Sequence, residues 1–197
     1  MDERAKRIKI VIEEYNGVLP YTEVFYIESL KYSADRCIQA FTLYEQYKKN
    51  GSDADLIASL IQEALSHAAA LSRYFVPGTK NELSLARGNK FREAFNVTGE
   101  ILLMSKYPRN AMEHFDERLD QFLLNDLAGT IHPQARLGDH SEADSNIDYI
   151  FKLVDTENSI FIILGEKYHF GAVRQEVTRI LEVANEMLNN NGRLKKL

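Results

Sequence analysis

The sequence has a single cysteine and no long apolar run. Cys37 is the only cysteine among 197 residues, so the chain cannot form an intrachain disulfide. The longest apolar run, Ile160 to Leu164, is far shorter than the roughly 20 residues that span a bilayer. The first residues are charged and lead into no apolar segment. We therefore expect no secretion signal, no membrane span and a reducing, cytoplasmic compartment.

The charge balance lacks the positive excess of a protein that coats nucleic acid. Lysine and arginine number 24 against 29 acidic residues, which gives a formal net charge of −5. Because binding to the phosphate backbone depends on many basic side chains, any contact with RNA must be local. Hydrophobic residues make up 45% and charged residues 27%, as in ordinary globular proteins, and the length favours a single domain over residues 1–197.

Apolar residues recur at spacings of three and four through most of the first 129 residues, which is typical of amphipathic helices. Ile8, Ile10 and Ile12 recur at every second position, so a strand is an alternative for the first segment, although a helix fits better. The spacing predicts helices over residues 5–15, 22–49, 56–75 and 82–95, another that opens near residue 100, and one from Pro108 to Leu127.

The C-terminal part has a different pattern. The polar stretch 130–146 is predicted to be a loop, and two segments rich in β-branched and aromatic residues, 147–154 and 159–164, predict a hairpin. A final helix is expected before Asn190. The predicted fold is mainly α: an up-and-down helical bundle with a small C-terminal β-hairpin and a terminal helix. The hairpin and terminal helix, residues 147–190, form an appendage to the bundle.

Arg109, Asn110 and His114 are the candidate catalytic residues. They can bind an anion, donate hydrogen bonds and exchange a proton near neutral pH. Asn110 and His114 share one helix face because they are four residues apart, whereas Arg109 is rotated from His114 by roughly 140 degrees. Since Arg109 follows Pro108, it falls in a first helical turn, where unsatisfied backbone donors favour a phosphate.

Each of these residues also has a plain structural interpretation. His114 can bond to Glu117, and Arg109 can form a weak surface ion pair with Glu113. Asn110 can be a helix-start hydrogen-bonding residue, a role that does not exclude a catalytic one.

The segment Arg109-Asn110-Ala111-Met112-Glu113-His114 resembles the signature of HEPN-family proteins. In that family, an arginine, a polar residue, three further residues and a histidine lie on a helix of an α-helical bundle. The resemblance covers residues 22–129. It implies a metal-independent endoribonuclease without cofactors, acting as a homodimer that brings two copies of the motif into one cleft, in a defence or toxin–antitoxin setting with an antitoxin or other protein partner.

RNA supplies its own nucleophile, the 2′-hydroxyl, so such an enzyme must remove one proton, stabilise the phosphate and protonate the leaving 5′-oxygen. One histidine cannot readily do both proton transfers in one step. Two copies of His114 across a two-fold axis could carry out the two proton transfers, with Arg109 stabilising the phosphate and Asn110 orienting it. Cleavage would leave 2′,3′-cyclic phosphate ends.

A second function stays open: a non-catalytic, dimeric helical module that binds RNA, a nucleotide or a protein. Basic residues gather at Arg87, Lys90 and Arg92 beside Phe91, where a polynucleotide could pass, although a solvated helix face is the commoner explanation.

Four residues of the predicted loop carry groups that bind metals: His132, Asp139, His140 and Glu142. Their spacing matches no specific metal motif, so a solvated loop is favoured and we predict no metal site.

Overall fold

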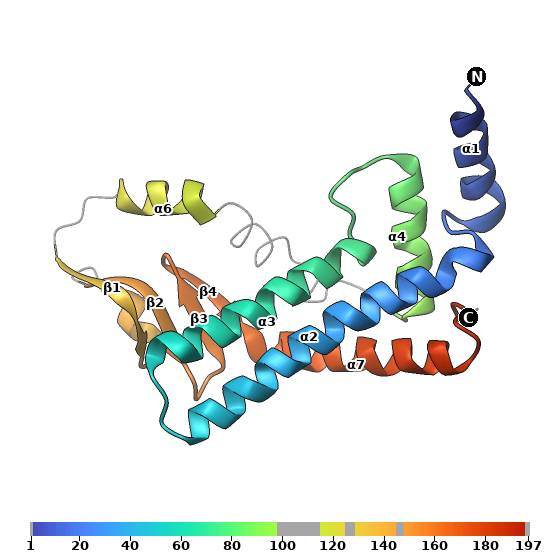
Figure 1. The fold of residues 1–197 in the computed structure, drawn as a ribbon. Helices are drawn as coiled ribbons and strands as arrows, with labels where there is room; N and C mark the ends of the chain where they lie inside the picture. The colour runs from blue at the N-terminus through green and yellow to red at the C-terminus, as the bar shows by residue number, and fades with distance from the viewer. Residues whose placement is uncertain (1, 98–114, 125–128, 145–147, 196–197) are drawn as a thin grey trace. The chain divides into compact units, whose positions relative to one another are not determined.

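The computed structural model describes residues 2–97, 115–124, 129–144 and 148–195 (Figure 1). This part of the chain is mainly helical, with six α-helices, of which the last is a terminal helix, and a four-stranded mixed sheet near the C-terminus, which confirms the predicted fold class. Within these residues, each helix is too short or too polar to cross a lipid bilayer.

The helices are α1 (Glu3–Tyr15), the 3₁₀ turn η1 (Pro20–Thr22), α2 (Glu23–Lys49), α3 (Ala54–Phe75), α4 (Glu82–Ala94), α6 (Phe115–Leu123), the 3₁₀ turn η3 (His140–Asp144) and α7 (Phe170–Asn189). The strands are β1 (Thr130–Leu137), β2 (Asp148–Asp155), β3 (Ile160–Ile163) and β4 (Glu166–His169). Contacts divide the chain into two compact units. Unit 1 combines residues 1–36, 67–105 and 176–197, and unit 2 combines residues 37–66 and 106–175.

Helix ends follow from residues that satisfy the free backbone groups. The Asp2 side chain accepts a hydrogen bond from the Arg4 N–H at the start of α1, and Asn81 does the same for Ser84 at the start of α4. Helix α1 ends at Tyr15 and is capped by Asn16, whose backbone is left-handed with φ of 50°. The predicted ends of the first helices are therefore confirmed, as is the end of α7 at Asn189.

Unit 1 has an aromatic core around α4. Phe91 and Phe95 are fully buried. The Phe91 ring lies 5.3 Å from the Tyr26 ring and 6.3 Å from the Tyr74 ring, and Phe95 lies 5.6 Å from Phe75, all between ring centroids. These tilted contacts between α2, α3 and α4 stabilise the helices beyond the area they bury.

A buried ion-pair network in the same unit ties α4 and the C-terminal segment to the start of α2. Glu23 is 4% exposed and accepts hydrogen bonds from Lys90 Nζ at 2.9 Å, Arg193 Nε at 2.8 Å and the Leu194 N–H at 3.1 Å. Burial raises the pKa of Glu23, but the hydrogen bonds from Arg193 and Lys90 outweigh it and hold the pKa below its ordinary value. Lys90 also donates to two backbone carbonyls of the α1–α2 connection, so its charge is fully engaged.

Unit 2 contains the sheet, in the order β1-β2-β3-β4. Strands β2 and β3 pair antiparallel, with Asp155 opposite Ile160, which confirms the predicted hairpin. All four residues of β3 are buried, as expected for an interior strand. Phe170 at the start of α7 packs against Phe41 and Tyr44 of α2, with ring centroids 6.0 and 5.5 Å away.

The prediction of a loop over residues 130–146 was wrong. Residues Thr130–Leu137 form the edge strand β1, which pairs parallel to β2, and η3 follows it. The register shifts between His132 and Ala135, around Pro133, which has no backbone N–H to give to a ladder. Because most of the strand is exposed and one residue is proline, its sequence lacks the alternation that marks a strand.

Candidate functional site

The predicted catalytic residues Arg109, Asn110 and His114 lie outside the described residues. The described chain resumes at Phe115, directly after the motif, where α6 begins. Helix α6 is therefore the described element that follows the motif along the chain.

Helix α6 packs against the sheet of unit 2. The Phe115 ring lies 5.9 Å from the Phe151 ring, and Phe122 lies 6.5 Å from Tyr149, so both ends of the helix contact β2. Between these contacts Arg118 makes an ion pair with Glu166 of β4. The segment that follows the motif is thus attached to the sheet at three points.

A pocket of about 320 Å³ lies beside α6 and the β3–β4 turn. Its lining residues are Arg118, Gln121, Phe122, Leu164 and Glu166. The guanidinium of Arg118 is neutralised by Glu166 and also donates to the Tyr168 hydroxyl at 3.2 Å. Among the described lining residues, the pocket therefore offers no unpaired cation to an anionic ligand.

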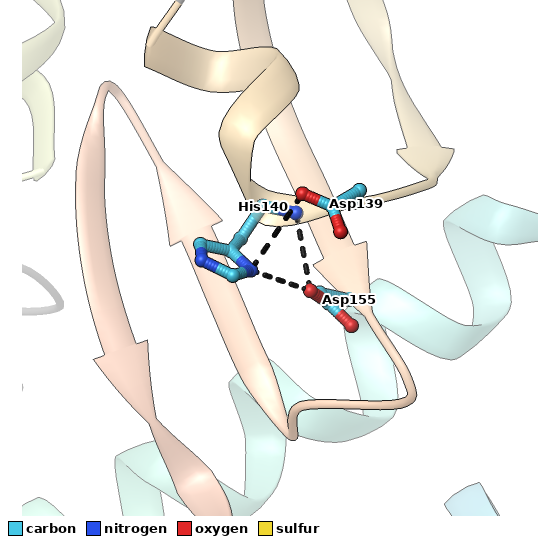
Figure 2. Close-up of side chains that lie close together, drawn as sticks. All are labelled: Asp139, His140 and Asp155. Carbon is cyan, nitrogen blue, oxygen red and sulfur yellow. Dashed lines mark hydrogen bonds and ion pairs between the residues drawn. The ribbon is translucent and has the colours of Figure 1, made fainter.

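A hydrogen-bonded polar cluster of unit 2 centres on Asp155 at the end of β2 (Figure 2). The Asp155 side chain is 3% exposed. Its Oδ1 accepts from the N–H groups of Glu157 and Asn158 at 3.1 and 2.9 Å. Its Oδ2 accepts from Asn158 Nδ2 at 2.8 Å and from the His140 N–H at 3.1 Å.

His140, in η3, completes this cluster through its ring. The distance from His140 Nδ1 to Asp155 Oδ2 is 2.7 Å. Burial would raise the pKa of Asp155, but the hydrogen bonds from Asn158 and His140 hold it well below its ordinary value. Because an ionised carboxylate can only accept, the proton of the neutral ring lies on Nδ1.

This geometry leaves Nε2 of His140 as the ring nitrogen that faces away from Asp155. The side chain is 34% exposed, and Figure 2 shows the far side of the ring turned away from both carboxylates. A buried carboxylate that fixes the tautomer of a histidine and stabilises its protonated form is the arrangement used for proton transfer in many enzymes. The pair His140–Asp155 can therefore accept a proton at Nε2 and return it.

Asp139, His140 and Asp155 also bring three possible metal ligands within 4.8 Å of one another. Their atoms are already committed to hydrogen bonds. Asp139 Oδ1 accepts from the Ser141 N–H at 2.8 Å and from Ser141 Oγ at 2.6 Å. A cation at this point would have to displace these contacts and deprotonate Nδ1, so the cluster fits an Asp–His pair better than a metal site.

The four loop residues considered as metal ligands are only partly brought together. Asp139 and His140 adjoin, and Glu142 accepts a hydrogen bond from the Asp139 N–H at 3.0 Å while it pairs with Arg136 at 3.2 Å. His132 Nε2 instead lies 3.2 Å from Asp148 Oδ1. Sequence reasoning missed Asp155, the residue that organises the cluster. The signal was present in Asp155-Thr156-Glu157-Asn158, because an aspartate that opens a turn commonly bonds to the backbone two residues on.

Comparisons of the chain with protein-family models, curated proteins and solved structures found no match.

Proposed function

We propose that this chain is a metal-independent endoribonuclease that leaves 2′,3′-cyclic phosphate and 5′-hydroxyl ends. The observation that carries the proposal is the HEPN-like order of Arg109, Asn110 and His114, directly before helix α6. In the reaction, a base takes the proton of the 2′-hydroxyl and the 2′-oxygen attacks phosphorus. The bond to the 5′-oxygen breaks as an acid protonates that oxygen.

The His140–Asp155 pair supports the proposal from geometry. Transesterification without a metal needs protein groups that take and give protons near neutral pH, and histidine is the side chain suited to both. His140 is oriented by a buried carboxylate through Nδ1, and its side chain is 34% exposed. We assign it as a second candidate for proton transfer, beside His114.

The proposal includes a setting and partners. The enzyme acts in the cytoplasm as a homodimer, in which two copies of the motif share a cleft, and in a defence or toxin–antitoxin context an antitoxin protein restrains it. Its overall negative charge fits an enzyme that holds RNA at one local site rather than along its whole surface.

The test is cleavage of a mixed-sequence RNA in the presence of EDTA by the wild-type protein, His114→Ala, His140→Ala and His169→Ala. His169 is an exposed residue of β4 outside the Asp155 cluster, so it serves as the matched control. Circular dichroism checks that each variant is folded. We expect cleavage by the wild type and by His169→Ala, and a loss of at least about a hundredfold in His114→Ala.

The His140→Ala variant tests whether His140 takes part in the proton transfers. A similar loss would place His140 in the proton transfers, whereas full activity would give Asp155 and His140 a structural role and leave both transfers to paired His114. Equal cleavage by wild type and His114→Ala would contradict the proposal. Failure of every protein to cleave would favour the second candidate, a non-catalytic module that binds RNA, a nucleotide or a protein.

A further inference from the structure

Unit 1 contains a pocket of about 290 Å³ that carries two arginines. Ser33 of α2, Ala70, Arg73 and Tyr74 of α3, and Arg87 of α4 line it. These described lining residues include no acid. The volume is at the small end of the range for ligand sites, which suits a compact polar group.

Packing fixes the position of Arg87. Its backbone N lies so close to Gly17 that a side chain at Gly17 would collide with it, so the α1–α2 connection holds α4 at this point. The guanidinium carbon of Arg87 lies 6.0 Å from the centroid of the Tyr26 ring, within cation–π range. The Tyr26 ring in turn packs on Phe91. The arginine is therefore held in place before any ligand binds.

One atom of this arginine lacks a partner. Within the described part of the chain, Arg87 Nε is buried and makes no hydrogen bond. Leaving a buried donor unsatisfied costs about 1–3 kcal/mol, and more for a charged group, and a bound ion or water is one of the explanations for such an atom. An acceptor within hydrogen-bonding distance of Nε would remove this cost.

The neighbouring basic residue does not share this property. Lys90, three residues further along α4, is engaged by Glu23 and two backbone carbonyls. The two basic residues therefore differ: Lys90 is engaged in an ion pair, whereas Arg87 lines the pocket.

We propose that the pocket formed by Ser33, Arg73, Tyr74 and Arg87 binds a phosphate group. A guanidinium presents several donors in a planar fork that matches phosphate oxygens, and these charge-assisted hydrogen bonds are stronger than neutral ones. The hydroxyl groups of Ser33 and Tyr74 add donors of the kind that commonly contact phosphate. The phosphate belongs either to a free anion or to the backbone of a nucleic acid strand.

The test is a titration of ¹⁵N-labelled protein, followed through the arginine Nε–Hε signals. The Arg87 signal is identified by its absence in Arg87→Lys. The probes are inorganic phosphate and a short single-stranded DNA oligonucleotide, which lacks the 2′-hydroxyl and so binds without cleavage. Sodium chloride at equal ionic strength is the anion control. Arg92→Gln, on the same helix but outside the pocket, is the matched control variant.

We expect the Arg87 Nε–Hε signal of the wild type and of Arg92→Gln to shift with phosphate and not with chloride. Arg87→Gln and Arg73→Gln should bind at least about tenfold more weakly, as judged from backbone amide shifts around the pocket. Two arginine variants are used so that one remains informative if the other fails to fold. If the oligonucleotide displaces phosphate, the site binds the backbone phosphate of a nucleic acid strand. If it does not, the site binds a free anion.

Unchanged affinity for phosphate in both arginine variants would contradict the proposed phosphate site. The absence of any shift of the Arg87 signal with either probe would also contradict it. Because the readout is binding and not cleavage, the result does not depend on whether the chain is a ribonuclease.

Discussion

A buried carboxylate stays charged only when donors surround it, and Asp155 meets this condition from two directions. The N–H groups of Glu157 and Asn158 come from the β2–β3 turn, whereas His140 comes from η3. The same residue therefore closes the hairpin and orients a histidine. The His140 side chain is partly exposed, which is why we assign it as a second candidate for proton transfer.

We predict that Asp155→Ala lowers the free energy of unfolding at pH 7 by about 3 kcal/mol, because it leaves several buried donors without an acceptor. Asp120→Ala is the control, because Asp120 is an exposed residue of α6 outside the Asp155 cluster, and we expect a change within about 0.5 kcal/mol. Urea denaturation of both variants measures the difference, and equal stability of the two would contradict the role given to Asp155.

The same interaction has a pH dependence of known sign. The pKa of Asp155 is lowered in the folded protein, so its stabilising contribution is complete above the unfolded-state pKa of about 4. It is lost as the pH falls from there toward the folded-state pKa. The difference between wild type and Asp155→Ala should therefore shrink below about pH 4. A difference that stayed constant with pH would show that the lost stability does not come from the charge.

At the scale of elements, the helices could be predicted from the sequence because each carries its own signals. Apolar periodicity and the Asn16-Gly17 stop mark the first helix, and Asn81 marks the start of α4. Strand β1 could not be predicted, because a parallel edge strand depends on its partner β2 and not on its own pattern. The Asp155–His140 contact could not be predicted for the same reason, because the sheet brings these two residues together.

The β3–β4 turn carries a strained residue that can be tested. Leu164 and Gly165 both have positive φ, at 51° and 79°, between the paired residues Ile163 and Glu166. Two-residue turns of this kind favour asparagine before glycine, and leucine is costly in the left-handed region. We predict that Leu164→Asn raises the free energy of unfolding by about 0.5–1 kcal/mol.

Leu124→Asn is the control for this change, because Leu124 is 85% exposed and lies outside the turn. Its effect should stay within about 0.5 kcal/mol. Thermal and urea denaturation measure both variants. Destabilisation by Leu164→Asn would mean that packing of the leucine outweighs the strain of its backbone.

At the scale of the whole molecule, the proposed cleavage by paired motifs requires two chains. A protein of 22.6 kDa per chain should therefore sediment as a particle of twice that mass at micromolar concentration. His114→Ala should sediment in the same way, because the proposal gives that histidine a chemical role. A wild-type monomer under the conditions of cleavage would exclude the paired arrangement and direct attention to His140 within one chain.

The most direct test of the central claim is the requirement for the 2′-hydroxyl. The protein is given an RNA that it cleaves and the same RNA with a single 2′-deoxy nucleotide on the 5′ side of the cut, with EDTA present. We expect the all-RNA strand to yield a 2′,3′-cyclic phosphate and a 5′-hydroxyl end, and the substituted strand not to be cut at that position. Cleavage of the substituted strand at an equal rate would show that water, and not the 2′-oxygen, attacks phosphorus, and would contradict the proposed mechanism.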